Sequence, residues 1–155
     1  MKKKTVVSAS IFSIIIILIF VNLFKDEVWE ENATKLKASF HPVSGSAIID
    51  DFATWTPFKW DTLYSFSPYT SKDIIYNTVG YKWDKIDETV SEGMTQIVFV
   101  NDGKVVCYLY GHPENNNIGF DFGEYTGNYI KLTNEQKLRF KVTELNNIYY
   151  LDYIK

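Results

Sequence analysis

The sequence predicts an α+β protein, in which a single N-terminal transmembrane helix precedes a small, mainly antiparallel β-sheet domain with one or two short helices. Three observations predict this class. Residues 5–24 are strongly apolar and contain no ionisable side chain. Two later segments, 97–110 and 137–154, place strand-like runs on both sides of a turn signal, as β-hairpins do. One segment, 70–80, has helical spacing between a capping residue and a glycine.

The apolar run at 5–24 is long enough to cross a bilayer. Twenty helical residues rise about 30 Å, which is the thickness of the hydrocarbon core. Lys2, Lys3 and Lys4 precede the run. The positive-inside rule therefore places residues 1–4 in the cytoplasm and everything after the span outside it. We expect a single-pass protein of the cell membrane whose C-terminal domain is extracytoplasmic.

A cleaved signal peptide and a lipid anchor are the two alternatives to a permanent anchor. A signal peptide has a shorter apolar core, about 7 to 15 residues, and a pair of small residues at its cleavage site. Residues 22–26 offer no such pair. Lipidation after cleavage needs a cysteine at the end of the apolar run, and the only cysteine of the chain is Cys107. The sequence therefore favours an uncleaved anchor, with cleavage as the remaining alternative.

The part of the chain beyond the basic cluster is acidic and aromatic. All 19 acidic residues follow Lys4, together with 13 of the 16 basic residues. This part of the chain therefore has a formal charge of −6. Such a charge argues against nucleic acid and anionic lipid as partners. Aromatic residues make up 17% of the chain, which favours a strand-rich core or an aromatic binding face. Cys107 cannot form an internal disulfide and has the sequence context of a small buried residue.

Residues 25–41 are expected to form a juxtamembrane helix or stalk. The apolar side of this helix consists of Trp29, Ala33, Leu36 and Phe40, which recur at helical spacing. On the polar side, Glu31 and Lys35 are spaced to pair at i,i+4. An alternative role for Trp29 is that of an interfacial anchor at the level of the lipid headgroups.

The extracytoplasmic α+β domain is expected to comprise residues 42–155, because Pro42 and Gly45 break the preceding helix. Its first elements are predicted as a strand at 46–52, an aromatic turn at 53–61 around Pro57, and a second strand at 63–66. A short helix then follows Pro68.

This helix has the clearest local signals. Thr70 or Ser71 can cap its first turn, and Asp73 favours the positive end of the helix dipole. The buried side is predicted as Ile74, Ile75, Thr78 and Val79. Gly80 supplies the left-handed residue that ends the helix. Trp83 and Ile86 are expected to lay the next loop back over the core.

The second half of the chain is predicted to be almost all strand. The Asp102-Gly103 step accepts the positive φ angles of a tight turn, which predicts a hairpin between 97–100 and 104–110. A second hairpin is predicted to join 137–143 to 148–154 through a turn near 146–147. In its first arm, Leu138, Phe140 and Val142 alternate with Lys137, Arg139 and Lys141. One face of that arm should therefore be buried and the other exposed to water.

Residues 111–124, between the two hairpins, form the most irregular stretch, and a long loop is often functional or mobile. The candidate residues here are His112, Glu114 and Asp121, with Glu124 as a further acidic side chain. Their spacing fits no zinc or calcium template, so no metal, cofactor or catalytic residue is assigned. One alternative function is nevertheless a cell-envelope hydrolase that uses this loop with His112.

The segment Trp60-Asp61-Thr62-Leu63-Tyr64-Ser65-Phe66-Ser67-Pro68-Tyr69-Thr70-Ser71 precedes the predicted helix, and Val79-Gly80 and Val98-Phe99-Val100 follow. Together they resemble small membrane-anchored or lipoprotein-like extracytoplasmic proteins of Gram-positive bacteria. The resemblance covers residues 47–110 and the order of the later elements. The resemblance implies no particular activity, and this chain lacks the cysteine that anchors the lipid-anchored relatives.

An aromatic platform is the candidate binding site. Its members are Trp55, Phe58, Trp60, Tyr64, Tyr69 and Trp83, whose rings combine flat apolar contact with polar edges. The alternative is that these rings pack between the helix and the sheet. We expect a membrane-tethered, non-catalytic binding or interaction domain for a protein, peptide or glycan. An accessory subunit of a membrane complex is a further alternative.

Overall fold

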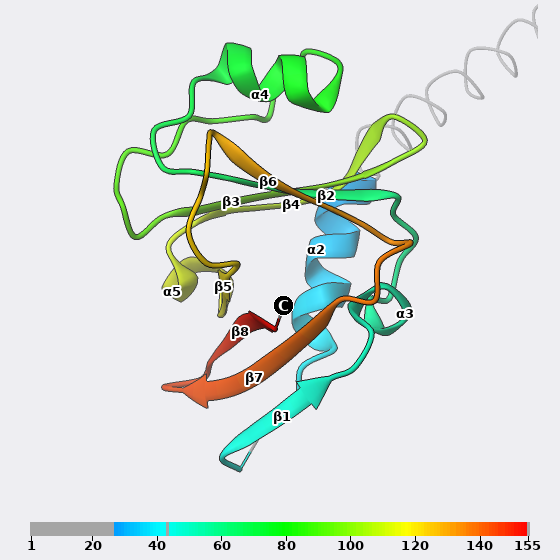
Figure 1. Cartoon of the computed structure of the whole chain (residues 1–155), viewed down its shortest axis with the longest axis vertical. Helices are drawn as coiled ribbons and strands as arrows, with labels where there is room; N and C mark the ends of the chain where they lie inside the picture. Colours follow the sequence, from blue (N-terminus) through cyan, green and yellow to red (C-terminus); the bar gives the residue numbers. More distant parts are fainter. Residues whose placement is uncertain (1–26, 43, 155) are drawn as a thin grey trace, which may run out of the picture.

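The computed structural model describes residues 27–42 and 44–154, which fold around two β-sheets (Figure 1). The predicted cytoplasmic segment at 1–4 and the predicted span at 5–24 lie outside the described residues. In the described part, no helix is both long and apolar enough to span a membrane. The α+β class, with mostly antiparallel strands and few short helices, is confirmed.

One four-stranded sheet has the order β1-β7-β8-β5. Its strands are β1 (Ser46–Ile49), β7 (Arg139–Leu145), β8 (Ile148–Ile154) and β5 (Ile118–Asp121). The predicted β7–β8 hairpin is confirmed, and its turn uses Asn146 and Asn147 at φ 55° and 62°. Asparagine tolerates this left-handed conformation better than most residues. The β5–β8 pair is parallel, unlike every other strand pair of the described part.

The second sheet has the order β4-β3-β2-β6 and is entirely antiparallel. Its strands are β4 (Lys104–Gly111), β3 (Thr95–Asn101), β2 (Thr62–Phe66) and β6 (Tyr129–Thr133). The predicted β3–β4 hairpin is confirmed, with Asp102 and Gly103 both at positive φ in its turn. Strand β6 was not predicted, although it forms one edge of this sheet.

Four helices lie in the described part: α2 (Val28–Ala38), α3 (Phe52–Trp55), α4 (Lys72–Val79) and α5 (Pro113–Asn116). Helix α4 ends as predicted, at Gly80 with φ 100°. The expected first strand is too long, because β1 ends at Ile49 and Phe52 begins α3 instead. Asp51 starts that helical turn by accepting the Ala53 N–H through its side chain (3.1 Å).

The prediction that residues 111–124 are irregular is wrong for residues 113–121. Helix α5 occupies one turn, Asn117 stops it at φ 56°, and β5 follows immediately. Backbone pairing decided this outcome: β5 aligns in parallel with β8, beginning with Ile118 beside Tyr149. A pairing partner 31 residues along the chain leaves no local signal in the sequence.

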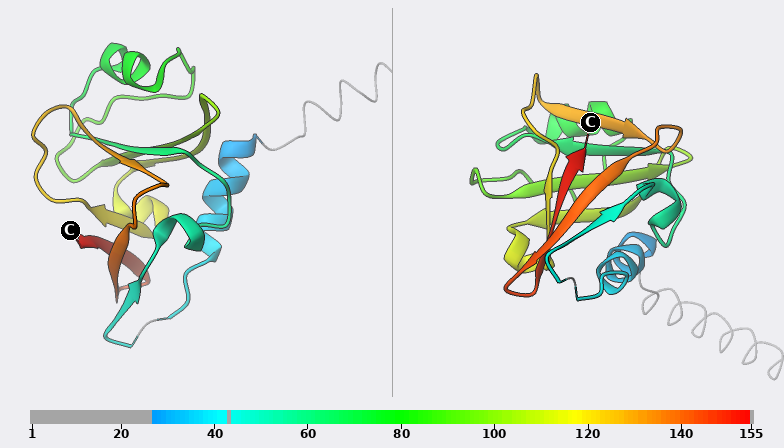
Figure 2. Two further views of the ribbon diagram at one scale, coloured as in Figure 1. Left: turned by 45° about the vertical axis from the view of Figure 1, so that its right-hand side comes forward. Right: turned by 60° about the horizontal axis from the view of Figure 1, so that its bottom comes forward.

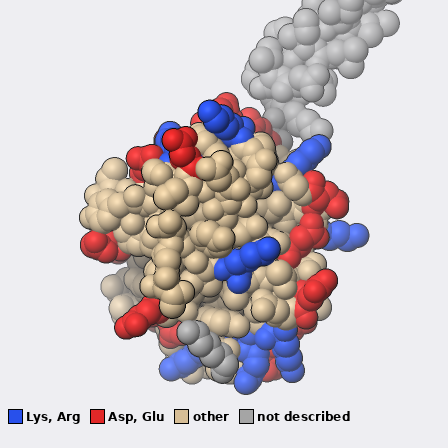
Figure 3. Space-filling view, turned by 45° about the horizontal axis from the view of Figure 1, so that its top comes forward, with Lys and Arg blue, Asp and Glu red and all other residues tan. Residues whose placement is uncertain are grey.

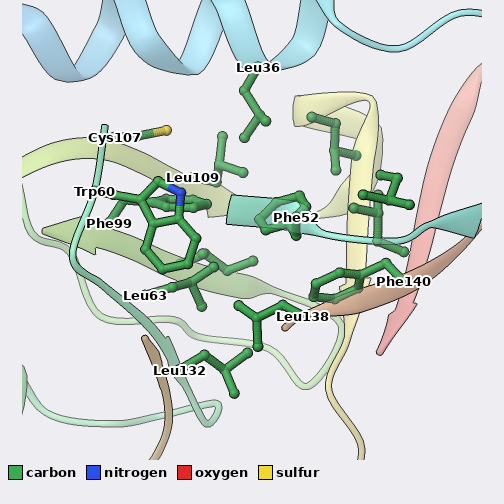
Figure 4. Close-up of a cluster of buried hydrophobic side chains, with 14 of the residues drawn as sticks. Leu36, Phe52, Trp60, Leu63, Phe99, Cys107, Leu109, Leu132, Leu138 and Phe140 are labelled. Atoms are coloured by element: carbon green, nitrogen blue, oxygen red, sulfur yellow. The ribbon is translucent and has the colours of Figure 1, made fainter. Parts of the chain in front are cut away.

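The main hydrophobic core fills the space between the two sheets and is closed at its sides by α2 and α3 (Figures 1 and 4). Phe52 of α3 points into its centre and is fully buried. Leu36 of α2, Phe99 of β3 and Phe140 of β7 surround it from three different elements. Residues that are far apart in the sequence therefore depend on one another for burial.

A second, smaller core covers the opposite face of the sheet that contains β3. Helix α4 contributes Ile75 and Val79, and the loop after it contributes Ile86. The prediction that this loop folds back over the core is therefore confirmed. Because both faces of β3 are covered, residues 96–100 are all buried. In contrast, β7 alternates between buried and exposed residues over 139–142, as predicted.

Helix α2 packs beside β4, at the edge of the second sheet (Figure 2). Leu36 reaches the main core and is fully buried, and the Asn32 side chain donates to the Val106 carbonyl (2.9 Å). The predicted Glu31–Lys35 ion pair is present at 2.7 Å. Helix α2 therefore contributes both apolar packing and a polar cover for a strand edge.

Candidate binding surface

Five of the six predicted platform residues are divided between the two faces of the β4-β3-β2-β6 sheet. Trp55, Phe58 and Trp60 belong to the main core, whereas Tyr64 and Trp83 pack against the second core. Tyr69 is the exposed member of the set, with 57% of its surface accessible. The structure therefore does not bring the six rings together on one surface.

Trp60 shows why the aromatic segment is mostly structural. Only 2% of its surface is exposed, and its indole N–H donates to Thr56 Oγ1 (2.8 Å). Its ring packs edge-on against Phe99 at 5.6 Å between centroids. A buried indole needs a partner for its N–H, and Thr56 supplies one from the turn after α3.

Trp83 packs edge-on between Trp29 and Tyr108, with centroid distances of 5.4 and 5.3 Å. Trp29 is also half-buried, and its indole N–H donates to Glu27 Oε2 (2.6 Å). Burial raises the pKa of Tyr108 to about 12. These rings connect the first turn of α2 to the second core.

An exposed aromatic surface does form where β2 meets the edge strand β6. We call it the tyrosine face and define it as Tyr64, Tyr129 and Lys131. The Tyr64 and Tyr129 rings meet edge-on at 5.8 Å, and both contact the buried Phe66 ring at 6.0 and 5.9 Å. Lys131 Nζ lies 5.9 Å from the Tyr64 centroid, within the range of a cation–π contact.

Strand alternation produces the tyrosine face. In β6, Ile130 and Leu132 point to the main core, so Tyr129 and Lys131 must point to the opposite side. Across the ladder, Tyr64 pairs with Lys131, which places both side chains on that same side. Viewed from the end that carries α4, charged side chains are sparse over the middle of the surface and more frequent around its rim (Figure 3).

Tyr69 lies in the turn that leaves β2, with a left-handed φ of 64°. This turn is tied to the residue before β6, because Ser67 N–H and Thr70 Oγ1 both donate to the Asn128 carbonyl (2.9 and 3.2 Å). Tyr69 N–H donates to Thr89 Oγ1 (2.9 Å). Its exposed ring is thus held by a fixed backbone beside the strand that carries Tyr129.

Sequence reasoning missed Tyr129 and Lys131 because it did not predict β6. The run Tyr129-Ile130-Lys131-Leu132-Thr133 alternates between side chains that suit an exposed face and apolar ones. This alternation is a period-2 signal, and it could have revealed the strand. Of the predicted ligand-binding residues, only Tyr64 is part of the tyrosine face.

The loop candidates are not gathered into one site. His112 precedes α5, where its N–H donates to Asn115 Oδ1 (3.1 Å), and Glu114 is exposed. Asp121 accepts the Gly123 N–H (2.7 Å) and lines a cleft of about 360 Å³ with Glu92 and Asp152. His112 and Glu114 do not line that cleft. Within 27–42 and 44–154, no group of three or more His, Cys, Asp or Glu side chains could hold a metal ion.

A groove of about 650 Å³ runs between α2 and the outer side of β4. Trp29, Tyr108 and Tyr110 provide its aromatic wall, and charged residues of α2 of both signs line it as well. Cys107, the neighbour of Tyr108, is buried and its pKa is raised by burial. This thiol is therefore closed to solvent in the folded domain.

Comparisons of the chain with protein-family models, with curated proteins and with solved structures found no match.

Proposed function

We propose that this chain is a membrane-tethered, non-catalytic binding domain that works outside the cytoplasm, and that the tyrosine face is its contact surface. The observation that carries the proposal is the exposure of Tyr129, 41% accessible on a strand whose alternate residues are anchored in the core. Tyr64 and Lys131 extend the same surface.

The physical basis of this proposal is the free-energy cost of exposing a large aromatic ring to water. Tyrosine offers wide apolar contact, a hydroxyl for hydrogen bonding and few rotatable bonds to immobilise, which suits it to binding surfaces. On this face, Phe66 supports both tyrosine rings from below. The surface is therefore held in one arrangement before any partner arrives, which lowers the entropic cost of binding.

The tether part of the proposal rests on the sequence. Residues 5–24 match the length and composition of a single span, and Lys2, Lys3 and Lys4 favour a cytoplasmic N-terminus. The described domain begins within a few residues of that run, at Val28 of α2. A folded domain so close to the span would remain beside the outer membrane surface.

Cysteine labelling tests the topology directly. Leu145 lies at the end of β7 beside the turn into β8, with 60% of its surface exposed, so the Leu145→Cys side chain should be accessible. We expect a membrane-impermeant maleimide to label Leu145→Cys in intact cells and to leave the wild type unlabelled, because its Cys107 is buried. Labelling that requires cell lysis would contradict an extracytoplasmic domain.

Photocrosslinking in the native cell tests the contact surface. A benzophenone amino acid at position 129 keeps an aromatic ring on the tyrosine face, and the same amino acid at position 145 is a matched exposed control. We expect an adduct of reduced mobility from position 129 alone, which the additional Tyr64→Ala substitution weakens at least fivefold. Equal adducts from both positions, or none from position 129, would contradict this assignment.

A further inference from the structure

The edge strand β6 has backbone groups that point away from its sheet. Two flanking hydrogen bonds fix the pattern: Ser67 N–H donates to the Asn128 carbonyl (2.9 Å) and Asn134 N–H donates to the Asp61 carbonyl (3.0 Å). Bonded and non-bonded pairs alternate along an antiparallel ladder. In this alternation, the backbone N–H and C=O groups of Ile130 and Leu132 bond to β2. The backbone groups of the residues between and beside these two point away from the sheet.

The outward groups belong to Tyr129, Lys131 and Thr133. Thr133 is already satisfied, because its N–H donates to Gln136 Oε1 (2.9 Å) and its carbonyl accepts the Gln136 N–H (3.1 Å). For the outward N–H and C=O of Tyr129 and Lys131, no partner is found among the described residues. The free part of this edge therefore coincides with the tyrosine face.

The opposite edge of the same sheet is closed by side chains from three different segments. Tyr81 Oη accepts the Val105 N–H (2.9 Å). Asn32 and Asn116 each donate through Nδ2 to an outward carbonyl of β4, at Val106 (2.9 Å) and Tyr110 (3.0 Å). An open strand edge invites pairing with another chain, and proteins commonly cover such edges. Among the residues that the structure describes, none covers the β6 edge at Tyr129 and Lys131 in a comparable way.

We propose that β6 binds an extended peptide segment of another protein by strand addition, beside the tyrosine face. This inference rests on the proposed binding function and names the class of partner. The peptide would pair with Tyr129 and Lys131 through up to four backbone hydrogen bonds, and a stretch of about five residues would cover the strand. Its alternate side chains would lie on the same side as Tyr129 and Lys131.

Charge decides between a foreign peptide and a second copy of this chain. Lys131 is the single ionisable side chain of β6 apart from the Tyr129 phenol, and it is exposed. The antiparallel register that pairs all of β6 with β6 of a second copy places Lys131 opposite Lys131, and like charges directly opposite destabilise a sheet. A peptide with an acidic residue opposite Lys131 and an apolar residue beside Tyr129 fits this edge better.

Proline at position 131 gives a specific backbone test. Because the Lys131 N–H points outward, Lys131→Pro removes a donor that the β2–β6 ladder does not use, and edge strands tolerate proline at such positions. Lys131→Gln keeps the N–H and removes the charge. An unchanged thermal unfolding midpoint, within a few degrees, would show that both variants fold.

Peptide selection supplies the probe. The full-length chain in lipid nanodiscs would select binders from a displayed library of random twelve-residue peptides, and the best peptide would be titrated against wild type and variants. We expect alternating apolar sequences with Asp or Glu, and binding weakened at least tenfold by Lys131→Pro. Lys131→Gln should weaken it less, and added salt should weaken wild-type binding but not the Gln variant.

The outcomes separate this inference from the proposed function. If Tyr129→Ala weakens peptide binding and Lys131→Pro does not, the tyrosine face remains the contact surface and strand addition is wrong. If neither change weakens binding, both proposals fail for that peptide site. Failure to enrich any peptide would overturn the peptide inference. The crosslinking experiment would still test whether the tyrosine face is the contact surface. Self-association that Lys131→Pro abolishes would assign the edge to a second copy and overturn the peptide partner.

Discussion

Replacing Phe52 by alanine is expected to cost about 3 to 5 kcal/mol of folding free energy, a large part of the stability of a typical small domain. Phe52 is fully buried between the two sheets. The rings in contact with it are Trp55, Trp60, Phe99, Phe120 and Phe140, at centroid distances between 4.8 and 6.4 Å. They come from both sheets, from α3 itself and from the segment before β2, so the cavity cannot be closed by moving one element.

Denaturant unfolding of the wild type and of Phe52→Ala measures this loss. Phe58→Ala is the matched control, since Phe58 is half-buried and packs edge-on against Phe99 at the border of the same core. Its cost should be smaller, because part of its ring is already exposed to solvent. An equal loss for both variants would contradict a central role for Phe52.

The position of Phe52 also shows a limit of sequence reasoning. The triplet Ala47-Ile48-Ile49 correctly predicts a strand, but the pattern gives no reason to end it before Phe52. Tertiary structure ends it instead: the Phe52 N–H donates to the Leu138 carbonyl (2.8 Å), 86 residues later in the chain. The carboxylate of Asp51 then caps a helical turn that begins where the sequence predicts the end of a strand.

The hairpins were predictable because their determinants are local. Asp102-Gly103 in one turn and Asn146-Asn147 in the other accept positive φ angles, and apolar residues on both sides fix the register. The helix that ends at Gly80 follows for the same reason. Strands β5 and β6 are short and take their partners from distant segments, so their few residues carry a weaker signal.

The candidate site was harder to predict than the fold. Leu63 and Tyr64 are adjacent in β2, yet they face different cores because alternate residues point to opposite faces. Both faces of this sheet are partly covered, so aromatic content alone cannot show which rings remain exposed. Which rings remain exposed depends on β6, because this strand brings Tyr129 and Lys131 beside Tyr64.

Helix α2 carries the second large effect. Leu36→Ala is expected to cost about 2 to 5 kcal/mol, because Leu36 is fully buried in the main core beneath β4. Thr34→Ala is the matched control, as Thr34 lies on the exposed side of the same helix. Alanine is a better helix former than threonine, so this control should leave stability unchanged or slightly raised. Thermal and denaturant unfolding of the full chain would compare them.

The comparison also tests the docking of α2 against the stalk, which was predicted for residues 25–41 as the alternative to a juxtamembrane helix. If Leu36→Ala destabilises the domain and Thr34→Ala does not, α2 is docked, and only residues 25–27 separate it from the predicted span at 5–24. Such a short connection would restrict how the tyrosine face can turn relative to the membrane. Equal behaviour of the two variants would instead support a stalk that holds the domain at a variable distance.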